Sequence, residues 1–370
     1  MGRYKVVEFV HGLSDGGAET LVKEYVRLID KTAFDPMVLV QQFNHHSTNE
    51  KEVRGLGVKV LPICSDSYVQ KLLFHFFRKE YTINSLKSIL RDTQPDVLHV
   101  HGQLLHYLAE ISEELKQIKL FYTCHSVPER YFTGEHKAEF DAAKKLIKNN
   151  NLQMIALHDQ MKEELNTMFG IQNTVVLRNG VDFNKFKDLE VNVAEYRQSI
   201  GIPSDAFVIG HVGRFIYIKN QTFLVDVFEE VLKRNNKAYL LMIGHGDDLS
   251  KIKDIIDSKK ISDHVIILSH RSDIAQLLRC MDVFVFPSLF EGIPLTLIEA
   301  QVSGLKCVCS DTINCEALVS NKTLSLPLDA GKERWADSIM SSEPSGICYV
   351  EPDEYDLYGV VRKLETLYQA

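Results

Sequence analysis

Short apolar runs alternate along the chain with longer stretches in which apolar residues recur at helical spacing. Strands that alternate with helical stretches indicate parallel sheets covered by helices on both faces. Twelve runs, rich in β-branched residues, predict buried strands at residues 5–10, 36–41, 58–63, 97–101, 120–125, 154–157, 174–180, 207–213, 239–244, 265–268, 282–288 and 306–311.

The runs fall into two series, and the second series starts at Met154. Two such series in 370 residues predict an α/β protein with two doubly wound, Rossmann-like domains. We expect the join near residues 178–192, where an Asn-Gly turn leads into a charged stretch, and domains at 1–185 and 186–353. Residues 354–370 carry one apolar helical face, which we expect to dock on the first domain.

Composition narrows the function classes. The net charge of −8 and the isoelectric point of about 6.0 argue against a nucleic-acid partner, which normally requires a basic surplus. The seven cysteines are odd in number and form no Cys-x-x-Cys pair, which is typical of reduced thiols in a cytoplasmic protein. We expect neither a signal peptide nor a transmembrane helix, because no apolar run is long enough.

Two glutamates, Glu291 and Glu299, enclose seven residues of which six are apolar. The preceding run predicts a strand, Pro294 predicts the start of a helix of about three turns, and Gly304 its end. Helical side chains lean toward the amino end, so both carboxylates are expected to border one crevice. A carboxylate that loses water needs hydrogen-bond donors, and sugar hydroxyls are suitable. The alternative is a pair of ordinary glutamates that the helix dipole favours.

Two cations follow another predicted strand. The run 207–213 leads into Arg214, and Lys219 precedes a predicted helix that begins near Asn220. Cations at the carboxyl end of a strand, beside a helix start, suit a diphosphate. Taken alone, the same residues would be solvated basic side chains in a loop.

Glycine turns follow two further strands. Gly16 and Gly17 come between the first strand and a predicted helix, where backbone amides can approach an anion or a sugar. Gly244 ends the run 239–244 and Gly246 follows it, without the full dinucleotide fingerprint of a Rossmann dehydrogenase. Each turn is weak by itself, and their order along the chain carries more information.

In that order the segments resemble the retaining glycosyltransferases of family 4, which include bacterial exopolysaccharide, capsule and lipid-glycan transferases. The resemblance spans essentially the whole chain and implies the GT-B fold, in which two Rossmann-like domains face each other across a cleft. The matching segments are GGAET from Gly16, HVH from His99, TCH ending at His125, RNGVD from Arg178, VGR with Lys219, and FEGIPLTLIEA from Phe290. Asn220 stands where the family usually has glycine, and Arg178 where it usually has proline.

The resemblance implies that the second domain binds a nucleotide sugar and the first an acceptor. Arg214 and Lys219 would neutralise the diphosphate, and Glu291 would bind the transferred sugar. His125 would lie near the C6 hydroxyl of the sugar, and Glu299 would hold the ribose hydroxyls. The remaining expected donor-binding residues are Gly16, Gly17, Gly213, Gly244, Gly292, Ile293, Pro294 and Leu295.

No Asp-x-Asp motif, with which transferases of another fold hold a divalent cation, occurs in the sequence. We therefore expect no metal and no cofactor besides the nucleotide-sugar co-substrate, with Arg214 and Lys219 stabilising the leaving group. His99, His101 and His125 suggest a zinc site, but no pattern supplies a fourth ligand. We place His99, His101 and Asn179 on the acceptor side instead.

The sequence thus predicts a cytoplasmic, metal-independent, retaining transferase that moves a hexose or N-acetylhexosamine, with UDP as the expected nucleotide. The acceptor would be a glycan or a lipid-linked glycan. Residues 67–81 mix apolar and basic side chains, which indicates either a peripheral membrane contact or a core helix with a solvated end. A GT-B epimerase, a disaccharide synthase and a catalytically silent nucleotide-sugar-binding partner remain alternatives.

Overall fold

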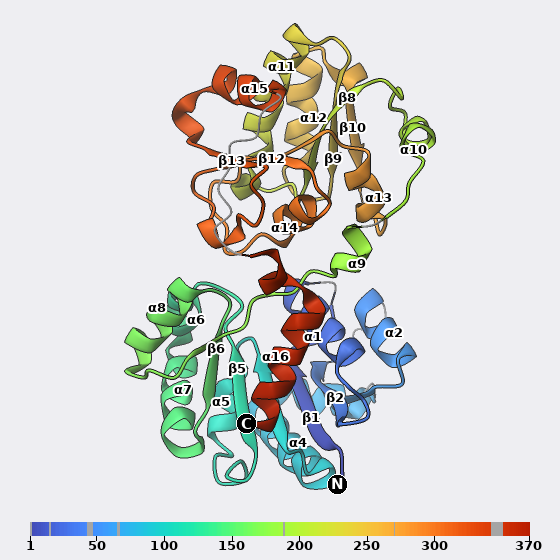
Figure 1. Ribbon diagram of the computed structural model, residues 1–370. Helices are drawn as coiled ribbons and strands as arrows, with labels where there is room; N and C mark the ends of the chain where they lie inside the picture. Colours follow the sequence, from blue (N-terminus) through green and yellow to red (C-terminus); the bar gives the residue numbers. More distant parts are fainter. Residues whose placement is uncertain are drawn as a thin grey trace. The chain divides into compact units, whose positions relative to one another are not determined.

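A computed structural model describes residues 2–14, 16–42, 47–64, 67–187, 189–269, 271–341 and 351–370. The chain forms two compact units, one of Met1–Gly180 with Tyr358–Ala370 and one of Val181–Leu357 (Figure 1). The expected domain limits lay at residues 185 and 353. The structure instead assigns α9 (Phe183–Phe186) and the residues just before α16 (Leu357–Gln369) to the second unit.

Within the described residues, the first unit holds a sheet of seven parallel strands in the order β3-β2-β1-β4-β5-β6-β7. The strands are β1 (Tyr4–Val10), β2 (Phe34–Gln42), β3 (Lys59–Cys64), β4 (Val97–His101), β5 (Lys119–Thr123), β6 (Gln153–Ala156) and β7 (Val175–Val176). The prediction that a second series starts at Met154 is wrong, because β6 and β7 complete this first sheet. An apolar run shows that a strand is buried but not which sheet it joins.

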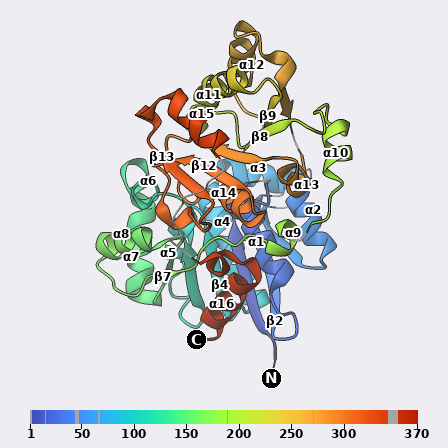
Figure 2. The same cartoon turned by 45° about the horizontal axis from the view of Figure 1, so that its top comes forward.

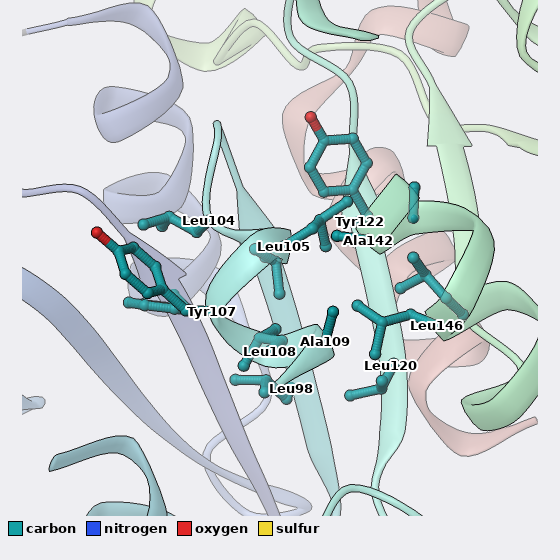
Figure 3. Close-up of a cluster of buried hydrophobic side chains, with 14 of the residues drawn as sticks. Leu98, Leu104, Leu105, Tyr107, Leu108, Ala109, Leu120, Tyr122, Ala142 and Leu146 are labelled. Carbon is teal, nitrogen blue, oxygen red and sulfur yellow. The ribbon is translucent and has the colours of Figure 1, made fainter. Parts of the chain in front are cut away.

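Alternating side chains of the strands build a core on each face of this sheet. On β2, Val38 and Val40 join an apolar cluster with the helices that precede and follow that strand, whereas Leu39 enters the cluster on the opposite face. Figure 3 shows part of the cluster that contains Leu39, in which Leu105 and Leu146 pack over the strands of the first sheet. The helices of the unit are α1 (Gly17–Leu28), α2 (Thr48–Gly55), α3 (Tyr68–Phe76), α4 (Arg78–Thr93), α5 (Leu105–Ala109), α6 (Pro128–Phe132), α7 (Lys137–Asn150), α8 (Asp159–Phe169) and α16.

The described part of the second unit holds six parallel strands in the order β10-β9-β8-β11-β12-β13. They are β8 (Phe207–Val212), β9 (Ala238–Ile243), β10 (Val265–Leu268), β11 (Val283–Phe286), β12 (Lys306–Ser310) and β13 (Thr323–Leu326). The helices are α9, α10 (Val193–Ser199), α11 (Gln221–Arg234), α12 (Leu249–Ser258), α13 (Ile274–Arg279), α14 (Leu295–Val302) and α15 (Lys332–Met340). The prediction of two Rossmann-like parallel sheets is confirmed, although β13 was not expected.

The chain passes between the units twice, and the two passing segments pair with each other. The amide of Val181 donates to the carbonyl of Tyr355 at 2.8 Å, and the amide of Leu357 donates to the carbonyl of Val181 at 3.0 Å. Helix α16 then lies over the first sheet, as Figures 1 and 2 both show. There the Lys119 ammonium at the start of β5 donates to the carbonyls of Tyr368 and Gln369 at 3.2 and 3.1 Å.

Candidate active site

In the second unit, the loops that follow the neighbouring strands β8 and β9 pack backbone against backbone. The amide of Gly213 donates to the carbonyl of Ile243 at 3.0 Å. Gly244 has φ +149, and a Cβ there would lie 2.0 Å from the Gly213 oxygen. A Cβ on Gly246, at φ +153, would lie 2.3 Å from the Phe215 oxygen. Close backbone packing therefore requires both glycines, whatever ligand the loop binds.

The loop after β8 brings Lys219 to Glu291. Their Nζ and Oε1 atoms are 2.7 Å apart, and both side chains are largely buried. The Lys219 ammonium also lies 4.7 Å from the centre of the Phe286 ring. The amide of Leu289 donates to the carbonyl of Ile218 at 2.8 Å, which ties this loop to the segment that follows β11. Two groups expected to contact different parts of a donor thus form one ion pair.

Arg214 is exposed, and its carbonyl accepts a hydrogen bond from Gln221, which in turn contacts His211; the sequence analysis singled out neither side chain. Gln221 donates from Nε2 to the Arg214 carbonyl at 2.7 Å and lies 3.3 Å from Nε2 of His211. His211 is fully buried and donates from Nδ1 to the carbonyl of Val285 at 2.9 Å. Burial lowers the pKa of His211 to about 4, so the ring is neutral at neutral pH and its Nε2 can accept from Gln221.

Asn220 occupies the position between this loop and α11. Its φ of +54 is left-handed, and asparagine is one of the few residues that adopt this conformation readily. Its side-chain amide donates to the carbonyl of Pro287 at 3.2 Å. Asparagine therefore adopts at this position a left-handed conformation that glycine also adopts readily.

The segment between β11 and α14 leaves backbone amides available. Pro294 is the N-cap of α14, one residue outside the predicted start, and the eight-residue helix has about two turns rather than three. Gly304, at φ +81, follows its C-cap as expected. The amides of Gly292, Ile293 and Leu295 donate to no other described residue. These donors lie in the segment that carries Glu291, at a helix start that favours an anion.

Glu299 is half-buried on α14. Burial raises the pKa of its carboxyl group to about 7, and the nearby Lys185 ammonium of α9 offsets only part of this effect. Its carboxylate has no hydrogen-bond partner among the described residues. A group in this state gains from hydroxyl donors, which is the role expected for ribose binding.

In the first unit, the turn after β1 carries Gly16 and Gly17. Neither glycine has a positive φ, and a Cβ on Gly17 would meet no atom within 4 Å. A Cβ on Gly16 would meet only the flexible end of Glu19. The Asn49 side chain anchors the turn by donating to the carbonyl of Ser14 at 2.7 Å. The fold itself thus does not require these glycines, in contrast to Gly244.

The predicted histidines of the first unit form a buried network with two residues that the sequence analysis missed, Glu8 and Tyr368. His101 donates from Nε2 to Glu8 at 2.8 Å, and its Nδ1 lies 2.8 Å from Nε2 of His125. The Tyr368 hydroxyl donates to the other Glu8 oxygen at 2.7 Å and lies 2.6 Å from Nδ1 of His99. We call Glu8, His99, His101, His125 and Tyr368 the histidine network.

Burial and the contacts among these residues together determine the charges in this network. Burial lowers the pKa of His101 to about 4 and holds the pKa of His125 well below its usual range. Burial also raises the pKa of Glu8, but attraction to His99 and the hydrogen bonds from His101 and His99 outweigh it and bring the pKa below its ordinary value. At neutral pH, Glu8 is therefore ionised while His101 and His125 are neutral.

Ligand atoms of Glu8, His99 and His101 lie within 4.8 Å of one another, a spacing compatible with a metal ion. This set differs from the zinc candidates in the sequence, because Glu8 replaces His125. Both ring nitrogens of each of the two histidines and both Glu8 oxygens already have hydrogen-bond partners. A bound ion would have to displace several of these bonds.

Asn179 makes no hydrogen bond to the histidine network. Its side-chain oxygen is buried without a hydrogen-bond partner in the described residues. Arg178, where the family usually has proline, forms an ion pair with Asp159 at 2.9 Å within the first unit. The extra cation is therefore already neutralised by the protein.

Residues 67–81 lie on α3 and the start of α4. The core-helix alternative is wrong for most of the apolar side chains, because only Phe74 is buried among those described. The exposed ones are Tyr68, Leu72, Leu73, Phe76 and Phe77, with Tyr68 at 81% and Phe76 at 69%. None of the helices described is long and apolar enough to span a membrane.

Comparison with models of protein families finds a glycosyltransferase model that matches each of the two units. Residues 15–185 match the model for Glycosyltransferase Family 4, and residues 192–340 match the model for Glycosyl transferases group 1. The chain is a family 4 glycosyltransferase. The resemblance that the motifs suggested is confirmed.

Relatives and solved structures agree with this assignment. The chain is 27% identical over 356 residues to the putative glycosyltransferase EpsF of Bacillus subtilis, covering 92% of this chain and 88% of that protein. It is 22% identical to the capsular polysaccharide biosynthesis glycosyltransferase CapH of Staphylococcus aureus, with 99% of both chains covered. Anabaena HepE, solved with UDP and glucose, superposes with a TM-score of 0.78 at 16% identity and full coverage of both chains. The lipopolysaccharide glycosyltransferase WaaG superposes with a TM-score of 0.72 at 13% identity, with 99% and 100% coverage. The GT-B fold is confirmed.

Proposed function

We propose that this glycosyltransferase is a retaining, metal-independent hexosyltransferase of polysaccharide biosynthesis. It would transfer a hexose or N-acetylhexosamine from a UDP-sugar to a glycan or lipid-linked glycan. The observation that carries the proposal is the Lys219–Glu291 ion pair, 2.7 Å long, in the segment that bears the unpaired amides of Gly292, Ile293 and Leu295. The name of CapH supports the pathway, and the UDP and glucose bound to HepE support the donor.

The difficult step is departure of the nucleoside diphosphate while the sugar becomes oxocarbenium-like. Negative charge then grows on the leaving phosphate, and fixed cations and helix amides lower the barrier. Lys219 has three donor hydrogens, so it can retain Glu291 while it also binds a phosphate oxygen. Exposed Arg214 supplies a second cation. Glu291 then accepts hydrogen bonds from the sugar hydroxyls.

Retention needs no dedicated base in this scheme. The acceptor hydroxyl attacks the anomeric carbon on the face that the diphosphate leaves, and the leaving phosphate takes its proton. We do not assign Glu291 as a covalent nucleophile, because its Oε1 atom is engaged by the Lys219 ammonium. Glu299, with its raised pKa and unpartnered carboxyl group, would bind the ribose hydroxyls.

Activity after removal of metal tests the proposal. The protein is dialysed against EDTA and supplied with UDP-glucose, UDP-galactose or UDP-N-acetylglucosamine and a lipid-linked acceptor, and the anomeric coupling constant of the product is measured by NMR. We expect turnover in EDTA with at least one donor and an α-linked product. Loss of turnover that Mg²⁺ or Mn²⁺ restores, or a β-linked product, would refute the proposed mechanism.

We also propose that the exposed apolar side chains of α3 and of Phe77, the residue after it, contact the membrane that carries a lipid-linked acceptor. Tyr68, Phe76 and Phe77 are 81%, 69% and 59% exposed, and Arg78 and Lys79 follow them directly. Aromatic and basic side chains on one short segment suit the interface of an anionic bilayer. Flotation with liposomes of phosphatidylglycerol should detect binding that is lost when all three aromatic residues become serine. Leu56→Ser, at an exposed apolar position on another segment, is the control.

A further inference from the structure

Arg78 is the first residue of α4, and two buried side chains hold its guanidinium group. Its Nη2 atom donates to Oε1 of Gln41 at 2.8 Å, and the guanidinium carbon lies 5.4 Å from the centre of the Phe74 ring. Because the Gln41 amide and the Phe74 ring are both neutral, neither compensates the positive charge of the arginine.

Arg78 forms no ion pair with a described residue, whereas Arg27, Arg54 and Arg178 of the same unit each pair with a carboxylate. The remaining N–H donors of its guanidinium group contact no acceptor in the part of the chain that the structure describes. These donors form a planar fork that matches the oxygens of a carboxylate or a phosphate. An arginine that is held in place with unused donors therefore indicates an oxyanion ligand.

Gln41 connects Arg78 to the carboxyl edge of the first sheet. Its Nε2 atom donates to the Tyr107 hydroxyl at 3.1 Å, and its Oε1 atom lies 3.3 Å from Nδ1 of His11, in the loop that follows β1. The strands that follow β1 in the chain lie first on one side of it and then, from β4, on the other. Ligands of doubly wound sheets bind beyond the carboxyl ends of the strands at such a switch point. All of these residues belong to the first unit.

The surroundings of Arg78 favour a phosphate that is attached to an apolar chain. The exposed ring of Phe77 directly precedes Arg78, and the exposed ring of Phe76 ends α3. An apolar chain can lie against these rings while the phosphate at its end reaches the guanidinium group. Lys79, the next cation along the chain, already pairs with Glu110 at 2.6 Å.

We infer that Arg78 binds a phosphate group of the lipid-linked acceptor and that Gln41 is the residue that positions it. The inference rests on the proposed function, which makes a lipid-linked glycan the acceptor. A headgroup phosphate of the bilayer offers the same chemistry. We assign the acceptor as the source, because the hydrogen bond from Arg78 to buried Gln41 directs the guanidinium group to the strand ends where ligands bind.

Binding of farnesyl diphosphate tests the site without any transfer of sugar. The full chain is titrated by calorimetry in saturating UDP, which keeps the diphosphate from Arg214 and Lys219, and farnesol is the uncharged comparison. We expect Arg78→Gln to weaken the binding of farnesyl diphosphate by about tenfold, the usual effect of losing a hydrogen bond to a charged group, and to leave the binding of farnesol unchanged. Equal affinities of the wild-type protein and folded Arg78→Gln for farnesyl diphosphate would overturn the inference.

Two control variants separate the acceptor phosphate from bilayer headgroups. Lys79→Gln removes the neighbouring charge, and Arg91→Gln removes an exposed arginine of the same helix that pairs with Asp92. Both should bind farnesyl diphosphate like the wild-type protein. Flotation with phosphatidylglycerol liposomes is measured in parallel, since attraction to an anionic surface should weaken on loss of either Arg78 or Lys79. If Lys79→Gln weakens the binding of farnesyl diphosphate as much as Arg78→Gln does, or if Arg78→Gln weakens only flotation, the arginine meets headgroups and the inference is wrong.

Gln41→Glu separates positioning from a purely structural role. The variant keeps an oxygen for Arg78 at the same volume, but its carboxylate would neutralise the guanidinium group. We expect a folded protein that loses about as much affinity for farnesyl diphosphate as Arg78→Gln, and unchanged affinity would refute the role of Gln41.

Turnover with a lipid-linked acceptor links the site to the reaction. Arg78→Gln should raise KM for the acceptor by about tenfold and leave KM for the UDP-sugar unchanged, whereas a change in KM for the UDP-sugar alone would contradict the assignment. A protein that binds farnesyl diphosphate through Arg78 but transfers no sugar would contradict the proposed function and not this site.

Discussion

The two units have the same kind of parallel sheet but place their polar groups differently. In the first unit, Glu8, His99 and His101 lie within strands, at most 2% exposed, and satisfy one another beneath α16. In the second unit, Lys219 and Glu291 lie in loops beyond the strand ends and remain partly accessible. The first arrangement fixes where protons reside, whereas the second leaves cations and amides free to change partners. The fold thus combines a rigid polar cluster with an adaptable one.

Removing the Lys219 ammonium should have the largest effect on catalysis. Lys219→Ala is expected to lower kcat by about 10²–10³-fold, the usual cost of losing one preorganised group that stabilises developing charge. Steady-state rates at saturating donor would measure it. Lys237→Ala, which removes an exposed lysine paired with Asp205 in the same unit, is the matched control. Equal rates for the two variants would contradict the role of Lys219.

A substitution at the close backbone contact between Gly244 and Gly213 in the second unit should have the next largest effect. Gly244→Ala would place a methyl group 2.0 Å from the Gly213 carbonyl oxygen, and we expect a loss of about 3 kcal/mol in unfolding free energy. The single tryptophan, Trp335, is buried in this unit, so its fluorescence during guanidinium unfolding reports the loss.

Gly17→Ala in the first unit provides the comparison, because its methyl group would meet no atom within 4 Å. Circular dichroism during the same titration should show a change within about 0.5 kcal/mol. A large loss in Gly17→Ala would mean that the fold, and not a ligand, requires that glycine.

The histidine network should show a smaller and more local effect. Tyr368→Phe removes a hydroxyl bonded to Glu8 and should cost about 2 kcal/mol, the range for a hydrogen bond to a charged group. Tyr25→Phe is the control, because that buried hydroxyl has no hydrogen-bond partner in the described structure. Thermal unfolding followed by circular dichroism should separate the two variants. Similar melting temperatures would show that the network adds little to stability.

The smallest effect concerns pH. The pKa of Glu299 is about 7 in the free protein, and hydroxyl donors favour its ionised form. Binding therefore lowers this pKa, so affinity should rise with pH through 7 and level off above it, by at most about tenfold between pH 6 and 8. Calorimetry with UDP-glucose, whose diphosphate does not titrate in this range, measures the affinity and the proton release. Glu299→Gln should show neither the rise nor the release.

The sequence predicts the strands well because burial in a parallel sheet requires continuous apolar runs. β13 escaped the analysis because Thr323 and Ser325 interrupt its apolar pattern and it lies at the sheet edge. The division at Met154 failed because the same pattern describes strands of either sheet. Local pattern therefore predicts elements better than it predicts their assembly.

The candidate site likewise contains features that the sequence predicts and contacts that it does not. The motifs located Lys219, Glu291 and the amides beside it, since each is encoded within a short segment. They did not show that Lys219 and Glu291 pair, or that Tyr368 reaches Glu8 across 360 positions of the chain. A glutamate within the apolar run KVVEFV was the one visible signal for the network, since a carboxylate in a buried strand needs donors from elsewhere.

The paired segments at Val181 and Tyr355 have a consequence for how the chain is made. The second unit is continuous, whereas the first needs both Met1–Gly180 and Tyr358–Ala370. A ribosome therefore exposes every residue of the second unit before it can release the last helix of the first. Tyr368 can therefore reach Glu8 only after the whole of Val181–Leu357 has been made, so the polar interior of the amino-terminal half is completed later than its strands.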